Sequence, residues 1–119
     1  MTDPARIVIV DDDRAIRWVL ERSLAQPDLS VESFERADTA LASLEASPPD
    51  VLVTDIRMPG LDGLELMARV RERHPDMPVI VMTAHSDLDS AVASYQGGAF
   101  EYLPKPFDVD EALALVRRA

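Results

Sequence analysis

The chain contains no cysteine among its 119 residues. A disulfide framework and a metal site built from thiolates are therefore both excluded. The absence also fits a reducing compartment, in which disulfides are rare. The longest apolar run near the N-terminus, residues 7–10, is far shorter than a signal peptide or a membrane span requires. We therefore expect a cytoplasmic protein that does not engage a membrane.

Basic side chains are scarce, since 12 lysines and arginines face 22 aspartates and glutamates and leave a net charge of −10. Such an acidic surface repels phosphates, so we expect no direct contact with nucleic acid. Histidine is also rare, and neither His74 nor His85 has a second ligand at the spacing typical of a zinc site. A P-loop and the phosphate-binding loop of flavin carriers are both absent.

Short apolar, β-branched runs alternate with helical patterns along the whole chain. The alternation predicts an α/β fold with a doubly wound parallel sheet and helices on both faces. We find no linker and no internal repeat, so residues 1–119 are interpreted as one domain. The end at Ala119 has neither a glycine cap nor a proline stop, which favours the N-terminal part of a longer protein. The expected strands are 6–10, 30–34, 51–54, 79–82 and 100–103, and the expected helices are about 14–25, 37–46, 63–74, 86–96 and 109–119.

Polar side chains follow four of the five predicted strands. Three aspartates at positions 11–13 follow the first strand, and Asp55 follows the third. Thr83 and Lys105 follow the fourth and fifth strands. If the strand order is 2-1-3-4-5, the first and third strands are neighbours at the topological switch point, where doubly wound sheets bind ligands. The aspartates would then converge, with Thr83 and Lys105 on the far side of Asp55.

Converging carboxylates need a counter-charge. Two of them about 4 Å apart repel by roughly 4 kcal/mol at an effective dielectric of 20, so a cation or bound protons must compensate. Hard, all-oxygen ligands suit Mg²⁺, and Lys105 supplies a further positive charge. An ionised Asp55 beside both cations could attack a phosphorus centre.

The motifs at these strand ends resemble the receiver domain of response regulators over essentially the whole chain. They are Val-Asp-Asp-Asp at 10–13, Asp-Ile-Arg-Met-Pro-Gly at 55–60, Met-Thr-Ala at 82–84 and Lys-Pro-Phe at 105–107. Residues 16–22, 83–89 and 102–108 further resemble the nitrogen regulatory protein C branch. The resemblance implies a flavodoxin-like, CheY-like fold with five parallel strands in the order 2-1-3-4-5 and five helices.

The resemblance also implies a phosphoacceptor and its metal. Asp55 would accept the phosphoryl group, and Asp12 would bind Mg²⁺ directly, with Asp11 acting mainly through water. The backbone carbonyl of Arg57 would be a further ligand. Spacing back from Arg17 favours Asp11 and Asp12 over Asp13 as the metal-binding pair, but a shift of one position stays open.

Three further positions would bind or report the phosphoryl group if the resemblance holds. Lys105 would pair with it, and Thr83 would hydrogen-bond one of its oxygens. Tyr102 occupies the switch-aromatic position, and the Lys105–Pro106 bond would be cis. The predicted helix at 86–96 contains weak helix formers, so we expect phosphorylation to shift its packing together with Tyr102.

The function that the resemblance implies is a signalling switch and not an enzyme in the usual sense. A sensor histidine kinase would donate the phosphoryl group, and the domain would assist its own phosphorylation and dephosphorylation. A longer protein would add an AAA+ ATPase that acts on sigma-54 polymerase and a DNA-binding domain. A dimer that forms on phosphorylation is an arrangement that the sequence leaves open.

Alternative interpretations exist for the same residues. A haloacid-dehalogenase-type phosphohydrolase would use Asp11 as its nucleophile, although no cap domain fits in 119 residues. A binding module that keeps the fold without phosphorylation would usually lack an acid, the threonine or the lysine, and this chain has all of them. The acidic triplet could simply cap a helix. Trp18 is predicted to point away from the sheet, either toward a partner or against a neighbouring helix.

Overall fold

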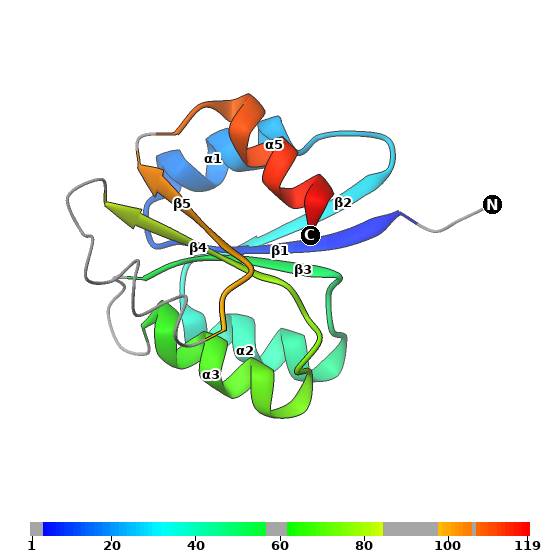
Figure 1. The fold of residues 1–119 in the computed structure, drawn as a ribbon, viewed down its shortest axis with the longest axis vertical. Coiled ribbons are helices and arrows are strands. Elements are labelled where there is room, and N and C mark those ends of the chain that lie inside the picture. The colour runs from blue at the N-terminus through cyan, green and yellow to red at the C-terminus, as the bar shows by residue number, and fades with distance from the viewer. Residues whose placement is uncertain (1–3, 57–61, 85–97, 106) are drawn as a thin grey trace.

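The computed structural model describes residues 4–56, 62–84, 98–105 and 107–119. Five parallel strands form one sheet in the order β2-β1-β3-β4-β5. Helices α1 (Arg14–Ser23) and α5 (Val109–Arg118) cover one face, and α2 (Ala37–Ala46) and α3 (Gly63–Arg73) cover the other (Figure 1). The predicted doubly wound sheet and its strand order are therefore confirmed.

The third, fourth and fifth strands extend further at their carboxyl ends than the sequence predicted, whereas the first and second end as predicted. Asp55 and Lys105 are the last residues of their strands, and Thr83 lies within its strand, because parallel pairing continues past the apolar runs. The helix predicted at 86–96 lies outside the described residues, as does the Lys105–Pro106 bond. The strands are β1 (Ala5–Val10), β2 (Leu29–Phe34), β3 (Val51–Asp55), β4 (Val79–Ala84) and β5 (Glu101–Lys105).

The sheet separates two hydrophobic cores. Ile7 and Ile9 of β1 belong to the core beneath α1 and α5, whereas Val8 and Val10 belong to the core above α2 and α3. Side chains alternate across a strand, so a strand covered on both faces must be apolar at every position. This burial explains why β1, β3 and β4 are nearly continuous apolar runs.

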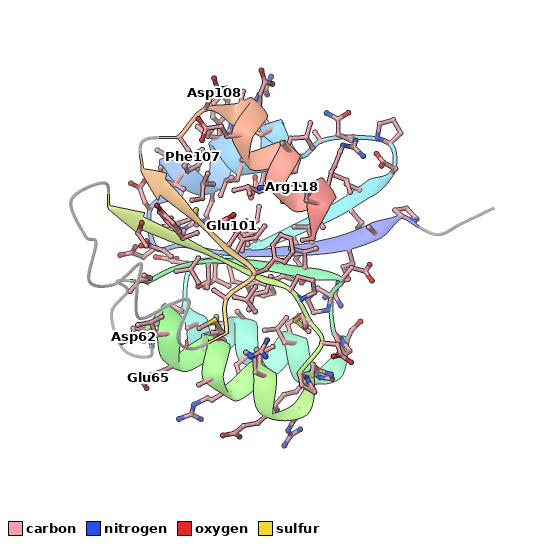
Figure 2. All side chains as sticks on the ribbon, viewed as in Figure 1. Asp62, Glu65, Glu101, Phe107, Asp108 and Arg118 are labelled. Atoms are coloured by element: carbon pink, nitrogen blue, oxygen red, sulfur yellow. The ribbon has the colours of Figure 1, made fainter. Side chains whose placement is uncertain are left out.

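Three of the four described helices begin at an aspartate whose side chain caps them. Asp13, Asp62 and Asp108 each accept a hydrogen bond from a backbone N–H in the first turn, at 2.9 Å. Such caps satisfy donors that the helix leaves unpaired. Figure 2 marks Asp62 and Asp108 at the starts of α3 and α5. None of the helices in the described part of the chain has the length and apolar character of a bilayer-crossing segment.

Helix α1 has a buried apolar side and an outward tryptophan. Leu20 and Leu24 are buried against the sheet. Trp18 is 58% exposed, and the guanidinium carbon of Arg22 lies 4.9 Å from its ring centroid. A shallow hollow joins Trp18 to Val109 at the start of α5. The outward direction of Trp18 is thus confirmed.

Candidate functional site

Three carboxylates converge at the carboxyl ends of β1 and β3. Asp11, Asp12 and Asp55 each offer one oxygen atom, and these three atoms lie within 4.8 Å of one another. The strands are neighbours, with Val10 opposite Thr54, so the residues that follow are brought together. Asp11 is fully buried and Asp55 is 9% exposed, whereas Asp12 is exposed. The cluster therefore remains open to solvent on the side of Asp12.

Asp11 is held at its amide, its carbonyl and its carboxylate. Its N–H donates to the Phe34 carbonyl of β2 at 3.1 Å, and its Oδ1 accepts from the Asp13 N–H at 2.9 Å. Its carbonyl oxygen accepts from Nη1 of Arg17 at 2.7 Å. Asp13 caps α1 with its own carboxylate and is not a member of the three-residue cluster. The backbone thus orients the buried acid before any cation binds.

Asp55 is positioned through its backbone. It pairs with Met82 of β4, and its carbonyl accepts from the Thr54 hydroxyl at 3.0 Å. A Cβ built on Gly63 would lie only 2.0 Å from that same carbonyl oxygen. The Gly63 N–H donates to the Ile56 carbonyl at 2.8 Å. The start of α3 therefore rests directly on the main chain that carries Asp55, and only glycine allows this approach.

Thr83 and Lys105 lie at the carboxyl ends of their strands, on the same side of the sheet as the acidic cluster. Thr83 is 2% exposed and lies one residue beyond Met82, the strand partner of Asp55. Lys105 ends β5 opposite Ala84, which places its backbone at this edge, although its side chain is outside what the structure describes. Arg57 also lies outside the described residues. Tyr102 is partly exposed and lines a hollow of about 330 Å³ between β5 and α5.

The donor set of the cluster suits a hard divalent cation. All three side chains offer carboxylate oxygens, and no sulfur or imidazole belongs to the group. One or two carboxylates with several retained waters are the usual protein ligands of Mg²⁺. The closely spaced carboxylates of the cluster repel one another, and a bound divalent cation would offset this repulsion.

Two residues that support the site were not predicted to do so. From the sequence, Arg17 indicated only the register of the acids, and Gly63 was not among the predicted site residues. The available signals were an arginine four positions after an acidic triplet and an Asp62-Gly63 pair at a helix start. Neither signal identifies the atoms that these residues contact, since both contacts depend on tertiary approach.

Comparisons with known proteins agree on one family. The family described as the response regulator receiver domain matches residues 7–117. The DNA-binding transcriptional regulator NtrC of Salmonella typhimurium strain LT2 is 62% identical over 111 residues, which is 93% of this chain and 24% of the relative. The chain thus spans about a quarter of that curated relative.

Solved structures of receiver domains are also similar to this chain. The apo receiver domain of nitrogen regulatory protein C has 58% identity and a TM-score of 0.87, covering 98% of this chain and 94% of the other. Its BeF3-activated form has the same identity and a TM-score of 0.84, covering 99% and 95%. The match therefore extends over the whole described fold.

Proposed function

The chain belongs to the response regulator receiver domain family, and from this premise we propose that Asp55 accepts a phosphoryl group from a sensor histidine kinase. The observation that carries the proposal is the convergence of Asp11, Asp12 and Asp55 within 4.8 Å. Asp55 stands at the end of the central strand, and the exposed Asp12 gives the cluster a solvent-facing side from which a phosphoryl group would approach. The domain is part of a regulator and not an enzyme in the usual sense.

The transfer exchanges one bond to phosphorus for another. A carboxylate oxygen of Asp55 attacks the phosphorus of a phosphohistidine, and the new P–O bond forms as the P–N bond breaks. The electron pair of the broken bond returns to the imidazole. Asp11, Asp12, Asp55 and the Arg57 carbonyl would hold Mg²⁺, which when bound neutralises charge on the phosphoryl oxygens.

Two side chains at the same edge would bind the product. The Lys105 ammonium would pair with a phosphoryl oxygen, and the Thr83 hydroxyl would donate a hydrogen bond to another. Because Thr83 is buried, its movement requires neighbouring side chains to repack. Tyr102, which lies opposite Val81 in the β4–β5 pairing, would respond to this movement from the neighbouring strand.

The output would come from additional domains. We interpret residues 1–119 as the receiver part of a longer cytoplasmic regulator, because the chain spans only 24% of its NtrC relative. That relative is described as a DNA-binding transcriptional regulator. The attached AAA+ ATPase and DNA-binding domain would control transcription with sigma-54 polymerase in nitrogen regulation. Phosphorylation-dependent dimerisation and assisted dephosphorylation would complete the cycle.

Mass measurement after incubation with acetyl phosphate and Mg²⁺ tests the proposal. The wild-type chain should gain about 80 Da, and peptide mapping should place the group on Asp55. Asp55→Asn should show no gain, whereas Asp76→Asn, a matched change at an exposed turn, should behave as wild type. A gain in Asp55→Asn that maps to Asp11 would instead support the phosphohydrolase interpretation.

A further inference from the structure

We propose that Arg17 is a positioning residue of the magnesium site, a role that rests on the proposed function of the acidic cluster. Its Nη1 donates to the Asp11 carbonyl at 2.7 Å from one turn into α1. Long helical side chains reach back toward the helix N-terminus, so position 17 suits this contact. The bond connects α1 to the buried acid without occupying either carboxylate oxygen.

The arginine is placed against the local electrostatic preference of the helix. Helix N-termini favour acidic side chains, and α3 and α5 follow this rule with Glu65 and Asp110 in their first turns. The first turn of α1 has no acidic residue and begins with Arg14. Arg14 and Arg17 both depart from this preference, and the hydrogen bond to the Asp11 carbonyl is what distinguishes Arg17 from Arg14. Through this bond Arg17 also brings a positive charge to the segment that carries Asp11 and Asp12.

Loss of Arg17 should leave Asp11 and Asp12 less firmly positioned. Asp11 is fully buried, and removal of the guanidinium takes away a donor that its carbonyl uses. The backbone between β1 and α1 would then be held less firmly, and Asp11 and Asp12 could shift relative to Asp55. Mutation of a residue that orients a metal ligand typically lowers the metal affinity by about 10- to 100-fold.

Calorimetric titration of the 119-residue chain with MgCl₂ tests this role. Arg17→Gln should raise the Mg²⁺ dissociation constant about 10-fold, and Arg17→Lys, which keeps the charge and one donor, should raise it by only about 2- to 3-fold. Arg14→Gln removes the same charge from an exposed position of the same helix and should change it by less than about 2-fold.

Phosphorylation by acetyl phosphate provides a second readout. In Arg17→Gln the half-saturating Mg²⁺ concentration should rise, while the rate at saturating Mg²⁺ stays within about 2-fold of wild type. Equal Mg²⁺ affinity in Arg17→Gln and Arg14→Gln would overturn the positioning role. Absence of Mg²⁺ binding by the wild-type chain would instead reject the proposed function itself.

A measurement without any variant covers the case in which Arg17→Gln does not fold. In the NMR spectrum of the wild-type chain, saturation with Mg²⁺ should shift the guanidinium signals of Arg17 and the carbonyl signal of Asp11. The guanidinium signals of Arg14 should stay in place. Arg17 signals that do not respond to Mg²⁺ would contradict the proposal.

Discussion

At the residue scale, Gly63 and the backbone of Asp55 are in direct contact. A methyl group on Gly63 would meet the Asp55 carbonyl oxygen at 2.0 Å and the Ile56 Cα at 2.9 Å. Both neighbours are backbone atoms of the chain segment that ends β3, so neither can rotate away. The close approach is thus a requirement for placing α3 against the backbone of Asp55, the proposed phosphoacceptor.

Gly63→Ala should therefore destabilise the domain, by about 1–3 kcal/mol. The expected sign is opposite to the usual gain from alanine in a helix. The same variant should weaken Mg²⁺ binding, because relief of the clash displaces the main chain of Asp55. Urea denaturation and calorimetric titration measure the two effects.

Gly98→Ala is the matched control for this variant. Gly98 has a φ of +98°, and its added methyl group would meet mainly the flexible end of Arg71. The backbone strain should cost about 1–2 kcal/mol, with no change in Mg²⁺ affinity. Parallel losses of Mg²⁺ affinity in both variants would show that general destabilisation is responsible.

The sequence predicted which acids converge at the site, but it did not predict which residues hold them in place. The meeting of strand ends predicted that the aspartates at 11–13 converge with Asp55. The family resemblance and the spacing back from Arg17 favoured Asp11 and Asp12, and the structure brings these two together with Asp55. The contacts of Arg17 and Gly63 could not be predicted in the same way. They depend on distances between a helix start and a strand end, which no periodicity encodes.

At the element scale, the residue that caps α1 is distinct from the residues of the acidic cluster. Asp13 caps the helix through the Ala15 N–H, and the acidic cluster consists of its two predecessors and Asp55. Asp13→Ala should lower the free energy of unfolding by about 1 kcal/mol and leave Mg²⁺ affinity within about 2-fold. Chemical denaturation and Mg²⁺ titration of the same samples measure both quantities.

Asp108→Ala provides the comparison, since Asp108 caps α5 through an equivalent 2.9 Å bond to the Asp110 N–H. Both variants should lose similar stability if capping is the whole role of Asp13. A 10-fold loss of Mg²⁺ affinity in Asp13→Ala alone would assign Asp13 to the metal instead.

The element boundaries show where sequence patterns stop being informative. Helix α2 begins and ends where its pattern predicted, at residues 37–46. Strand β5 was predicted to end at residue 103 but continues to Lys105, past Pro104. A proline lacks an N–H, yet an edge strand tolerates it. Whether a strand lies at an edge depends on the whole sheet, so this extension could not be predicted locally.

At the scale of the whole molecule, one ion pair joins distant parts of the chain. Arg117 of α5 donates to both carboxylate oxygens of Asp28, at 2.7 and 3.2 Å, across 89 positions of sequence. The hydrogen bonds from Arg117 hold the pKa of Asp28 below its ordinary value of 3.8. A lowered pKa in the folded state stabilises the fold above pH 3.8, and this stabilisation is lost as the pH falls further.

Asp28→Asn should consequently lower the melting temperature slightly at pH 7, and the difference from wild type should vanish in strongly acidic solution. The effect is small because both side chains are exposed and solvent screens the pair. Arg117→Gln should reproduce it, and the double variant should add nothing more. A difference that persists unchanged at the lowest pH would mean that the pair is not its cause.

The middle position of β3 in the sheet has an electrostatic consequence. Neighbouring strands lie about 4.8 Å apart, so the end of this strand is roughly 10 Å from either edge of the sheet. That distance is about one Debye length at physiological ionic strength. A dianion added at Asp55 would therefore change the potential at both rims of the domain at once, and a charged partner on either side could sense it through the field before any helix moves.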